Sequence, residues 1–326
     1  MILVTGATGF IGRVLVKDLL ASGHRVRVAC RKSDPEYAEC PDIELCNVGS
    51  IGPDTDWRPA LHDIDIVIHL AGVAHVLEQS DHADEDFTNV NALGTKKLVE
   101  DVAGNPGITR FIFISSIGVI AEQSPVPINE RSPCNPSSAY GRSKLAAERY
   151  IESILADSVT DWVIIRPTLV YGKDNPGNMS RLIKFVDSNI PLPIGAISGS
   201  RSFVYVKNLT RFILVCLSNK QASRNTFVIS DNEPLTVVEL VQLIASSRGK
   251  KVQVFHVPVP LLRILAKLGD AVKGVFGKGI GIDTYSMDKL TGSLVVDSSH
   301  AKEVLSWLPP YTTQEAIRES FRDMGE

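Results

Sequence analysis

The sequence predicts an α/β fold, a doubly wound parallel sheet with a smaller C-terminal α/β lobe for substrate. Three observations predict it. Short β-branched runs alternate with helix-period segments through the first half of the chain. Runs such as "DIVIHLAG" are apolar throughout, as strands buried on both faces must be. The first run leads into a glycine-rich turn, "TGATGFIG", which precedes an amphipathic helix.

The first half of the chain supplies the strands and helices of the expected sheet domain. The expected strands are Ile2 to Val4, Arg25 to Cys30, Ile43 to Val48, Ile66 to Leu70, Phe111 to Ser115 and Trp162 to Ile165. The expected helices, where apolar residues recur at helical spacing, are Ile11 to Ala21, Phe87 to Val102 and Ala139 to Leu155. Strands joined by helices pair in parallel, so residues 1–170 are expected to form a Rossmann-type dinucleotide-binding domain.

The second half is less regular and is expected to form the smaller lobe. After Pro167 the segments "YGKDNPGN" and "NIPLPIGAISGS" are rich in Gly, Pro, Asn and Ser, and predict loops. Helices are expected at Leu209 to Leu217, Val237 to Ser246, Leu261 to Val275 and Thr313 to Met324. Residues 171–326 would form the substrate-binding lobe, although the chain could cross between the two lobes.

Length and composition exclude several function classes. A chain of 326 residues with 44% hydrophobic and 22% charged residues is typical of a globular protein large enough for two lobes. The formal net charge of -3 provides no basic field for nucleic acid. The cysteines lack the spacing of a zinc site or disulfide framework, and no apolar run is as long as a membrane span. A cytoplasmic protein without a transmembrane segment is therefore expected.

The glycine triplet has the spacing of a dinucleotide site. The turn after the first strand of a doubly wound sheet points backbone amides and a helix N-terminus at a pyrophosphate. Gly6 would permit the tight turn, Gly9 would let phosphates approach the main chain, and Gly12 would let the helix press on the sheet. A triplet alone could be a structural turn, but its place before an amphipathic helix favours NAD or NADP.

The end of the second strand, where the cofactor ribose would bind, reads "CRKSD". An acidic residue there would bind a free 2′-hydroxyl, whereas this chain has Cys30, Arg31 and Lys32. Because a guanidinium presents forked donors to a phosphate, Arg31 slightly favours NADP over NAD. In the alternative interpretation Arg31 stacks on adenine or faces solvent, and Asp34 reaches the ribose.

A serine-ended strand and a helix supply the candidate catalytic residues. Ser116 ends "FIFISS", and Tyr140 and Lys144 lie four residues apart in "SSAYGRSKLAAE", on one face of the expected helix. A nearby ammonium would lower the pKa of the phenol, which makes Tyr140 a usable general acid or base. Ser116 would hold the reacting oxygen by a hydrogen bond.

No metal site is expected. His69 and His75 flank a strand end, but no third ligand stands at metal spacing. Both are expected to be structural or to lie beside the cofactor.

Taken in order, these motifs resemble those of the extended short-chain dehydrogenases/reductases, also called NAD-dependent epimerase/dehydratases. The resemblance covers nearly the whole chain and is most specific in "TGATGFIG", "HLAG", "VNALGT", "FIFISS", "YGRSK", "RPTLVYG" and "SRSFVYVKNL". It implies that Ser116, Tyr140 and Lys144 are catalytic, with Asn91 in support. The cofactor contacts that it implies are Gly6, Thr8, Gly9, Phe10, Ile11, Gly12, Arg31, Asn47, Val48, Leu70, Ala71, Gly72, Tyr140, Lys144 and Pro167.

The family's usual substrates are nucleotide-linked sugars, so the resemblance implies a UDP-linked sugar as partner. Its expected contacts are Ser116, Asn178, Arg201 and Tyr205. Arg201 is the best candidate for the diphosphate because a guanidinium pairs bidentately with phosphate; a surface salt bridge is its alternative role.

The chain departs from the family pattern at three places. Ile117 and Gly118 follow Ser116, so no acid stands there to remove a carbon 5 proton, and sugar 4,6-dehydratase activity is not expected. The next residues, 119–121, read "VIA" where epimerases commonly have Val-Tyr-Gly. Asn47 replaces the aspartate that is usual near the adenine.

Three functions are compatible with these residues. The first is a 4-epimerase of a UDP-hexose or UDP-N-acetylhexosamine, in which Tyr140 takes the 4-hydroxyl proton. The second is a one-way, NADPH-dependent 4-keto-sugar reductase, such as those that reduce UDP-2-acetamido-2,6-dideoxy-hexulose. The third is a non-catalytic NAD(P)-binding assembly protein, against which the intact Ser116, Tyr140 and Lys144 argue.

Two expectations concern surfaces. Family members commonly pair through the helices that bear "VNALGT" and "YGRSK", so a homodimer is possible. Residues 258–278 form an amphipathic segment that carries Arg263 and Lys267. That segment is expected to pack on the core of the lobe, and the alternative is that it lies on an anionic membrane surface.

Overall fold

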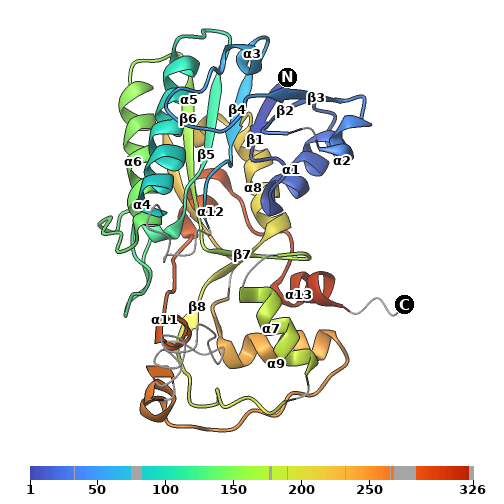
Figure 1. Cartoon of the computed structure of the whole chain (residues 1–326), viewed down its shortest axis with the longest axis vertical. Coiled ribbons are helices and arrows are strands. Elements are labelled where there is room, and N and C mark those ends of the chain that lie inside the picture. Colours follow the sequence, from blue (N-terminus) through green and yellow to red (C-terminus); the bar gives the residue numbers. More distant parts are fainter. Residues whose placement is uncertain are drawn as a thin grey trace.

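The central sheet has seven parallel strands in the order β10-β6-β5-β4-β1-β2-β3 (Figure 1). The strands are β1 (Ile2–Thr5), β2 (Val26–Cys30), β3 (Ile43–Asn47), β4 (Ile66–His69), β5 (Arg110–Ile114), β6 (Asp161–Pro167) and β10 (Asn225–Ile229). The computed structural model describes residues 1–326 apart from 33, 75–82, 176–177, 189, 232, 265, 268–283 and 323–326. The expected doubly wound α/β fold is confirmed.

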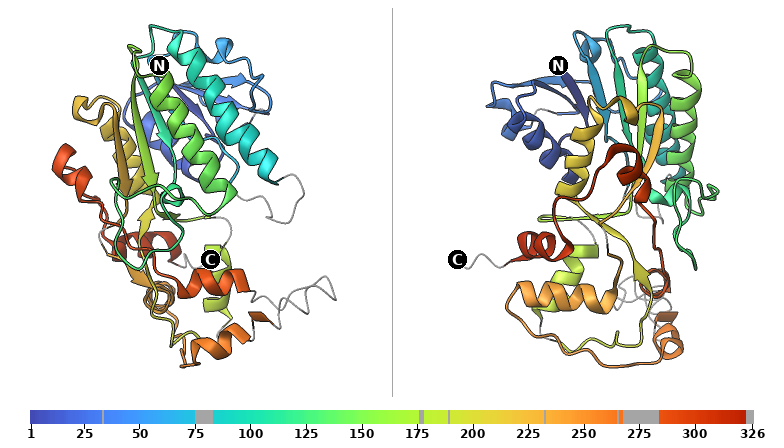
Figure 2. Two further views of the ribbon diagram at one scale, coloured as in Figure 1. Left: turned by 90° about the vertical axis from the view of Figure 1, so that its left-hand side faces the viewer. Right: turned by 180° about the vertical axis from the view of Figure 1, so that it is seen from behind.

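Helices cover both faces of this sheet (Figure 2). The long covering helices are α1 (Phe10–Ala21), α5 (Gly94–Ala103), α6 (Ala139–Ile154) and α8 (Val206–Cys216). On one face α1 and α8 bury Leu15 and Phe212 in a core shared with the strands. On the other face α5 and α6 bury Leu98 and Ile151. Because both faces are covered, the strands can be apolar throughout.

The expected helix from Phe87 to Val102 is divided into segments of different type. These are α4 (Ala83–Asp86), the π-helix η1 (Phe87–Leu93) and α5. A π-helical turn is rare and is frequently found at functional sites. Apolar spacing does not distinguish it from an α-helix, so the sequence predicted one continuous helix. The change of helix type places Asn91 in η1, fully buried.

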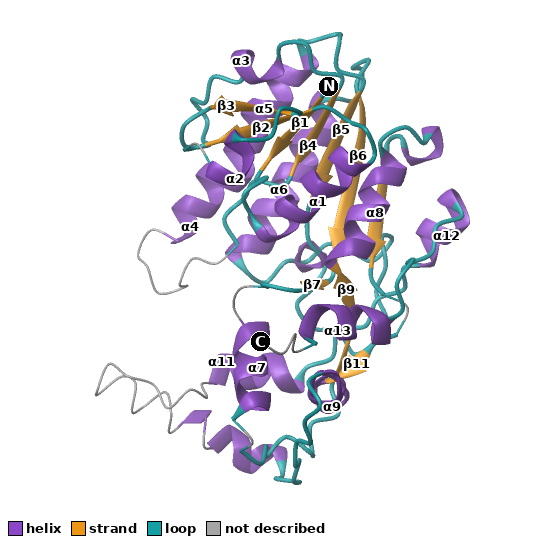
Figure 3. Ribbon diagram, turned by 90° about the vertical axis from the view of Figure 1, so that its right-hand side faces the viewer, coloured by secondary structure: helices purple, strands orange, loops and turns teal. Residues whose placement is uncertain are grey.

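The smaller lobe contains two short sheets and several helices (Figure 3). Its strand pairs are β7 (Leu169–Tyr171) parallel to β9 (Phe203–Tyr205), and β8 (Ser200–Arg201) antiparallel to β11 (Leu235–Thr236). Its helices are α7 (Asn178–Asp187), α9 (Val237–Ser247), α11 (Thr284–Thr291) and α13 (Thr313–Phe321). Val241 of α9 and Ile317 of α13 belong to one core.

The chain returns to the sheet domain after entering the lobe. Helix α8 covers the sheet, β10 pairs with β6 as its edge strand, and α12 (Ser299–Leu305) contributes Leu305 to the same core. The sheet therefore extends beyond residues 1–170. The pairing of Asn225 with Val163 is a long-range contact, and local patterning carries no signal for it.

Of the helices expected in the second half, three correspond to α8, α9 and α13. The expected helix Leu261 to Val275 falls largely outside the described residues. Within the described part, residues 259–264 and 266–267 are helical, and Leu262 and Ala266 are buried. No helix in the described ranges is long and apolar enough to cross a membrane.

Candidate active site

The glycine turn after β1 fits closely against the loop that follows β4. Gly6 has a φ of +69°, and a Cβ there would lie 2.6 Å from the Ala71 nitrogen. A Cβ on Gly12 would lie 2.2 Å from the Gly6 carbonyl oxygen. Both distances are too short for any side chain, so the turn requires glycine at these two positions.

The N-terminus of α1 is open to an anion. Gly9 is its N-cap residue and provides no side-chain hydrogen bond to the first amides. Those amides and the helix dipole favour a negatively charged group. Thr8 is exposed beside them, and the Phe10 ring packs toward Gly172 at the entrance to the lobe. Together these features fit the pyrophosphate of a dinucleotide.

At the end of β2, Arg31 and Lys32 are exposed. Asp34 has other partners: it accepts a hydrogen bond from the Glu36 amide at 3.0 Å and from the Arg13 guanidinium at 2.7 Å. Arg13 also contacts the carboxylate of Glu36. The acidic groups near the expected ribose site are thus paired with a cation from α1.

A short helix, α2 (Pro35–Ala38), supports the glycine turn from the outside. The hydroxyl of Tyr37, which is 2% exposed, donates to the Ala7 carbonyl at 2.7 Å. Burial raises the pKa of Tyr37 to about 12, so the phenol keeps the proton that this bond needs.

The other expected cofactor residues surround the same end of the sheet. Asn47 is exposed at the end of β3, and its side chain accepts from the Gly49 amide at 3.0 Å. The Val48 amide donates to the Cys30 carbonyl, and the Leu70 amide donates to the Thr5 carbonyl. Pro167 is the last residue of β6.

The side chain of Ser116 lies close enough to the Tyr140 phenol to affect its pKa. Ser116 caps the 3-10 helix η2 (Ile117–Val119), where its Oγ accepts from the Gly118 amide at 3.1 Å. Ser138 caps α6 and places Tyr140 in its first turn. Burial raises the pKa of the Tyr140 phenol, and the nearby Ser116 side chain opposes that shift.

Lys144 points toward the end of β5. Its Nζ donates to the Ile114 carbonyl at 2.9 Å and lies 4.6 Å from the centre of the Phe113 ring. Burial lowers the pKa of Lys144 to about 8, and the charge of Glu148 opposes this shift. The expectation that this ammonium lowers the pKa of Tyr140 is wrong for the structure, because the ammonium is directed at the strand end.

Gly72 brings three expected site residues together. A Cβ at this position would lie 3.0 Å from Oδ1 of Asn91 and 3.3 Å from Nζ of Lys144. Asn91 in turn holds the Val73 main chain, accepting from its amide at 2.8 Å and donating to its carbonyl at 3.0 Å. The absence of a side chain at Gly72 lets the loop after β4 pack closely against Asn91 and Lys144.

The residues expected to meet substrate are more dispersed. Arg201 on β8 is partly buried, and its burial lowers its pKa while the charge of Glu122 opposes the shift. Tyr205 is 2% exposed, contacts the ring of Tyr171 and faces Glu319 of α13, so its side chain lies in the core of the lobe. Asn178 is the first residue of α7, and its side chain is outside the described set.

Sequence reasoning missed the partners that fix these side chains. Glu148 and Arg166 form a buried bidentate ion pair, with N–O distances of 3.0 and 2.6 Å. The spacing of Glu148 one turn after Lys144 could have indicated it. Ser143 was also missed, although its hydroxyl links Asn91 to the main chain of Tyr140.

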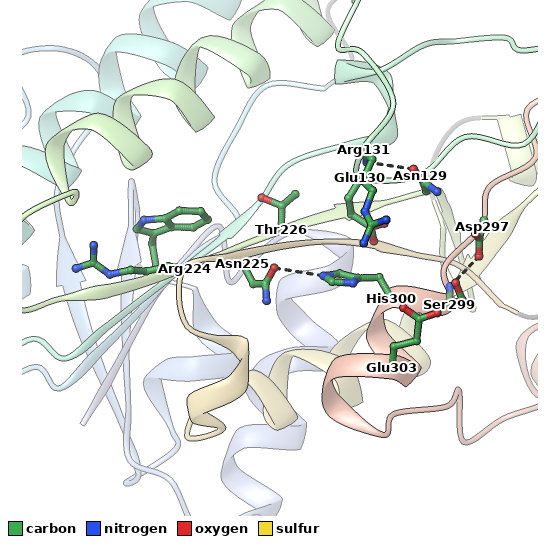
Figure 4. Close-up of a pocket in the computed structure, with 11 residues that line it drawn as sticks. Asn129, Glu130, Arg131, Arg224, Asn225, Thr226, Asp297, Ser299, His300 and Glu303 are labelled. Atoms are coloured by element: carbon green, nitrogen blue, oxygen red, sulfur yellow. Dashed lines mark hydrogen bonds between the residues drawn. The ribbon is translucent and has the colours of Figure 1, made fainter.

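A polar pocket of about 470 Å³ lies elsewhere, along the outer edge of β10 (Figure 4). Its lining includes Glu130, Thr226 and His300, and none of the expected site residues. Glu130 accepts a hydrogen bond from the Val228 amide of the edge strand. The carboxylate thus satisfies a main-chain donor at the edge of the sheet.

His69 and His75 were the two residues considered as metal ligands, and both were expected to be structural or to lie beside the cofactor. His69 is fully buried between hydroxyl groups. His75 lies outside the described residues. Across the ranges that the structure describes, no group of three or more His, Cys, Asp or Glu side chains is arranged to hold a metal ion.

The chain is similar to several known proteins. The model of the NAD dependent epimerase/dehydratase family matches residues 2–230. The chain is 37% identical to a UDP-glucose 4-epimerase of Vibrio cholerae, over 98% of this chain and 94% of the relative. It is 25% identical to the N-acetyl-alpha-D-glucosaminyl-diphospho-ditrans,octacis-undecaprenol 4-epimerase of Escherichia coli O157:H7, over 97% and 92%.

Solved structures of similar fold include UDP-glucuronic acid 4-epimerase from Bacillus cereus in complex with NAD. It superposes with a TM-score of 0.76 at 23% identity, covering 98% of this chain and 97% of that one. UDP-N-acetylglucosamine 4-epimerase from Bacillus cereus gives a TM-score of 0.75 at 23% identity, over 98% and 96%.

Proposed function

The chain is an enzyme of the NAD-dependent epimerase/dehydratase family, and from that premise we propose that it is a 4-epimerase of a UDP-linked hexose or N-acetylhexosamine. The observation that carries the proposal is that α6 holds Tyr140 near Ser116 and, one turn later, holds Lys144 beside Gly72. This arrangement supports a role for Tyr140 and Ser116 in proton transfer beside the position expected for a nicotinamide ribose. The Vibrio cholerae relative, named a UDP-glucose 4-epimerase, supports the choice of reaction.

In this proposal each residue has a separate task. In its deprotonated form, Tyr140 accepts the proton of the sugar 4-hydroxyl and returns it to the 4-keto oxygen after the sugar has turned over. Ser116 holds that oxygen by its hydroxyl, and Lys144 binds the nicotinamide ribose. When bound, the nicotinamide supplies hydride acceptance from carbon 4 and hydride return. Arg201 pairs with the substrate diphosphate.

We further propose that the cofactor site accepts NADP through Arg31 and Lys32. Arg13 already pairs with Asp34 and Glu36, and Lys17 pairs with Glu36 at 3.0 Å. These ion pairs neutralise the carboxylates that would repel a 2′-phosphate, and leave Arg31 and Lys32 exposed near it.

A 4-keto-sugar reductase is the second candidate. The exposed cations after β2 favour it, because a phosphorylated reductant that dissociates after each turnover suits a one-way reaction. Tyr140 would then donate its proton to the carbonyl oxygen. The two candidates share every residue of the site and differ in whether reduced cofactor is consumed.

Incubation of the purified chain with UDP-sugars, with and without NADPH, tests the proposal. A 4-epimerase interconverts the two sugar configurations with no net loss of NADPH absorbance. Stoichiometric loss of absorbance with a keto-sugar would indicate the reductase instead. Tyr140→Phe must abolish either reaction while NAD still binds; full activity in this variant would contradict the proposed roles.

We also propose a homodimer that forms through α5 and α6, which lie side by side on one face of the sheet (Figure 2). Light scattering after size-exclusion chromatography gives the mass, and a monomer at all concentrations would contradict it.

A further inference from the structure

A chain of hydrogen bonds joins the glycine turn to the helix that carries Tyr140, and it passes through His69. His69 is the last residue of β4 and is fully buried, with its ring stacked on Phe113 at a centroid distance of 5.7 Å. Its Nδ1 lies 2.7 Å from the hydroxyl of Thr5, and its Nε2 lies 2.9 Å from the hydroxyl of Thr95. The proposed reaction gives this residue no task.

The partners determine which ring nitrogen carries the proton. The Thr95 hydroxyl donates to the Asn91 carbonyl at 2.7 Å, so it must accept from His69 Nε2. Burial lowers the pKa of His69 to about 3, and the ring is therefore neutral. With the proton on Nε2, Nδ1 accepts from the Thr5 hydroxyl.

One side of this chain reaches the cofactor turn. Thr5 immediately precedes Gly6, and its Oγ1 accepts from the Ala71 amide at 3.1 Å. Ala71 is the residue against which Gly6 is packed. The Nδ1 side of His69 thus holds the contact between the glycine turn and the loop after β4.

The other side reaches the catalytic helix. Thr95 holds the main chain of η1 at Asn91, and the Asn91 side chain donates to Ser143 at 3.1 Å. The Ser143 hydroxyl donates to the Tyr140 carbonyl at 2.8 Å. The Nε2 side of His69 therefore supports the π-helical turn that contacts α6.

We propose that His69 is a positioning residue that couples the cofactor turn to the helix bearing Tyr140, with one ring nitrogen serving each side. The part that concerns turnover rests on the proposed function, whereas the part that concerns cofactor binding does not. Because the two nitrogens have opposite hydrogen-bonding roles, their contributions can be separated.

Two substitutions separate the sides. His69→Asn places an amide oxygen near the position of Nδ1, which keeps the acceptor for Thr5 and removes the donor to Thr95. His69→Gln places an amide nitrogen near the position of Nε2, which keeps the donor and removes the acceptor. We expect His69→Asn to lower kcat about fivefold with a near-normal Kd for NAD, and His69→Gln to raise the Kd about fivefold.

Calorimetric titration with NAD gives the Kd without any sugar, and initial rates with UDP-sugar give kcat. If His69→Asn folds poorly, Thr95→Val serves in its place, because it also breaks the contact between Nε2 of His69 and Thr95, and it should lower kcat in the same way. Thr160→Val is the matched control, because its buried hydroxyl donates to the Ile108 carbonyl far from the site, and it should change only thermal stability. If both His69 variants lower stability and leave Kd and kcat at wild-type values, the proposal is overturned. If the wild-type protein turns over no UDP-sugar while His69→Gln still raises the Kd for NAD, the result counts against the proposed reaction and leaves the role of His69 in cofactor binding intact.

Discussion

The charge of Lys144 depends on its surroundings. Its ammonium is buried against the Ile114 carbonyl and the Phe113 ring. The charge that favours its protonation is that of Glu148, one turn later in α6, which is itself held by Arg166. Burial is thus the main cause of the lowered pKa of Lys144, and the carboxylate of Glu148 opposes it.

We expect Glu148→Gln to lower the pKa of Lys144 below its present value of about 8. Below about pH 8 the side chain of Lys144 is protonated, and above about pH 8 it becomes neutral. Loss of the carboxylate removes the charge that favours the ammonium, so the alkaline limb of the pH profile of NAD affinity should move to lower pH. Titration with NAD over a pH series measures this shift.

Glu152→Gln is the matched control, since Glu152 lies one further turn along α6 and is not among the groups that shift Lys144. Its pH profile should superimpose on that of the wild type. Superimposable profiles for Glu148→Gln and the wild type would show that the pair does not tune Lys144.

The exposed cations after β2 lead to a prediction about cofactor choice. A charge-assisted hydrogen bond to phosphate contributes roughly 1.5–3 kcal/mol, so Arg31→Ala should weaken NADP binding about tenfold or more. NAD affinity should change little, because NAD lacks the 2′-phosphate. Titration of both cofactors measures the ratio, with Arg318→Ala on α13 as the control. Equal losses for NAD and NADP would argue that Arg31 contacts adenine instead.

At the scale of elements, the turn from β1 to α1 was predicted from sequence because its constraint is local. Three glycines at this spacing predict that main-chain segments approach each other closely, and the short distances at Gly6 and Gly12 agree with that prediction. The six strands of the first half were also predictable from their apolar runs. Each of these signals lies within a few consecutive residues.

Gly12→Ala should disrupt this turn. The added methyl would clash with main-chain atoms of Gly6 and Ala7, which cannot move aside as a side chain can. We therefore expect the free energy of unfolding to fall by about 1–3 kcal/mol and NAD to bind more weakly. Thermal denaturation and NAD titration measure the two effects. Gly104→Ala is the control: the φ of Gly104 is -78°, a Cβ there would make only ordinary contacts at 3.7 Å or more, and the stability of the variant should be unchanged or slightly higher.

The missed features depend on contacts that no local pattern encodes. β10 was not predicted because its place in the sheet follows from pairing with β6 after the chain has passed through the lobe. The π-helix was not predicted because the apolar positions of Phe87 and Ala92 fit a continuous helix equally well. The buried partners of Lys144 and Asn91 likewise come from several elements that meet only in the folded chain.

At the scale of the whole molecule, Asp231 joins the sheet domain to the lobe. It follows β10 and is 3% exposed. It accepts from the Tyr171 hydroxyl at 2.9 Å, from the Tyr205 amide at 3.0 Å and from the Asn208 side chain at 2.7 Å. A single carboxylate thus ties the edge strand to β7, β9 and α8.

Asp231→Ala should therefore leave three buried donors without an acceptor, which costs roughly 3 kcal/mol or more. We expect a lower melting temperature and a broader transition, because the lobe would lose a connection to the sheet. Scanning calorimetry measures both. Glu233→Ala, two residues later and exposed, is the control and should melt like the wild type. An unchanged transition in Asp231→Ala would show that the junction is stabilised elsewhere.

The carboxylate of Glu130 beside β10 has a consequence for self-assembly. A neighbouring molecule that tried to extend the sheet would need the outward amide of Val228, and Glu130 already occupies it. Glu130 thereby opposes edge-to-edge pairing of the sheets of two molecules through β10. Replacing Glu130 would leave the Val228 amide free to pair with another chain, so the variant should aggregate more readily during refolding.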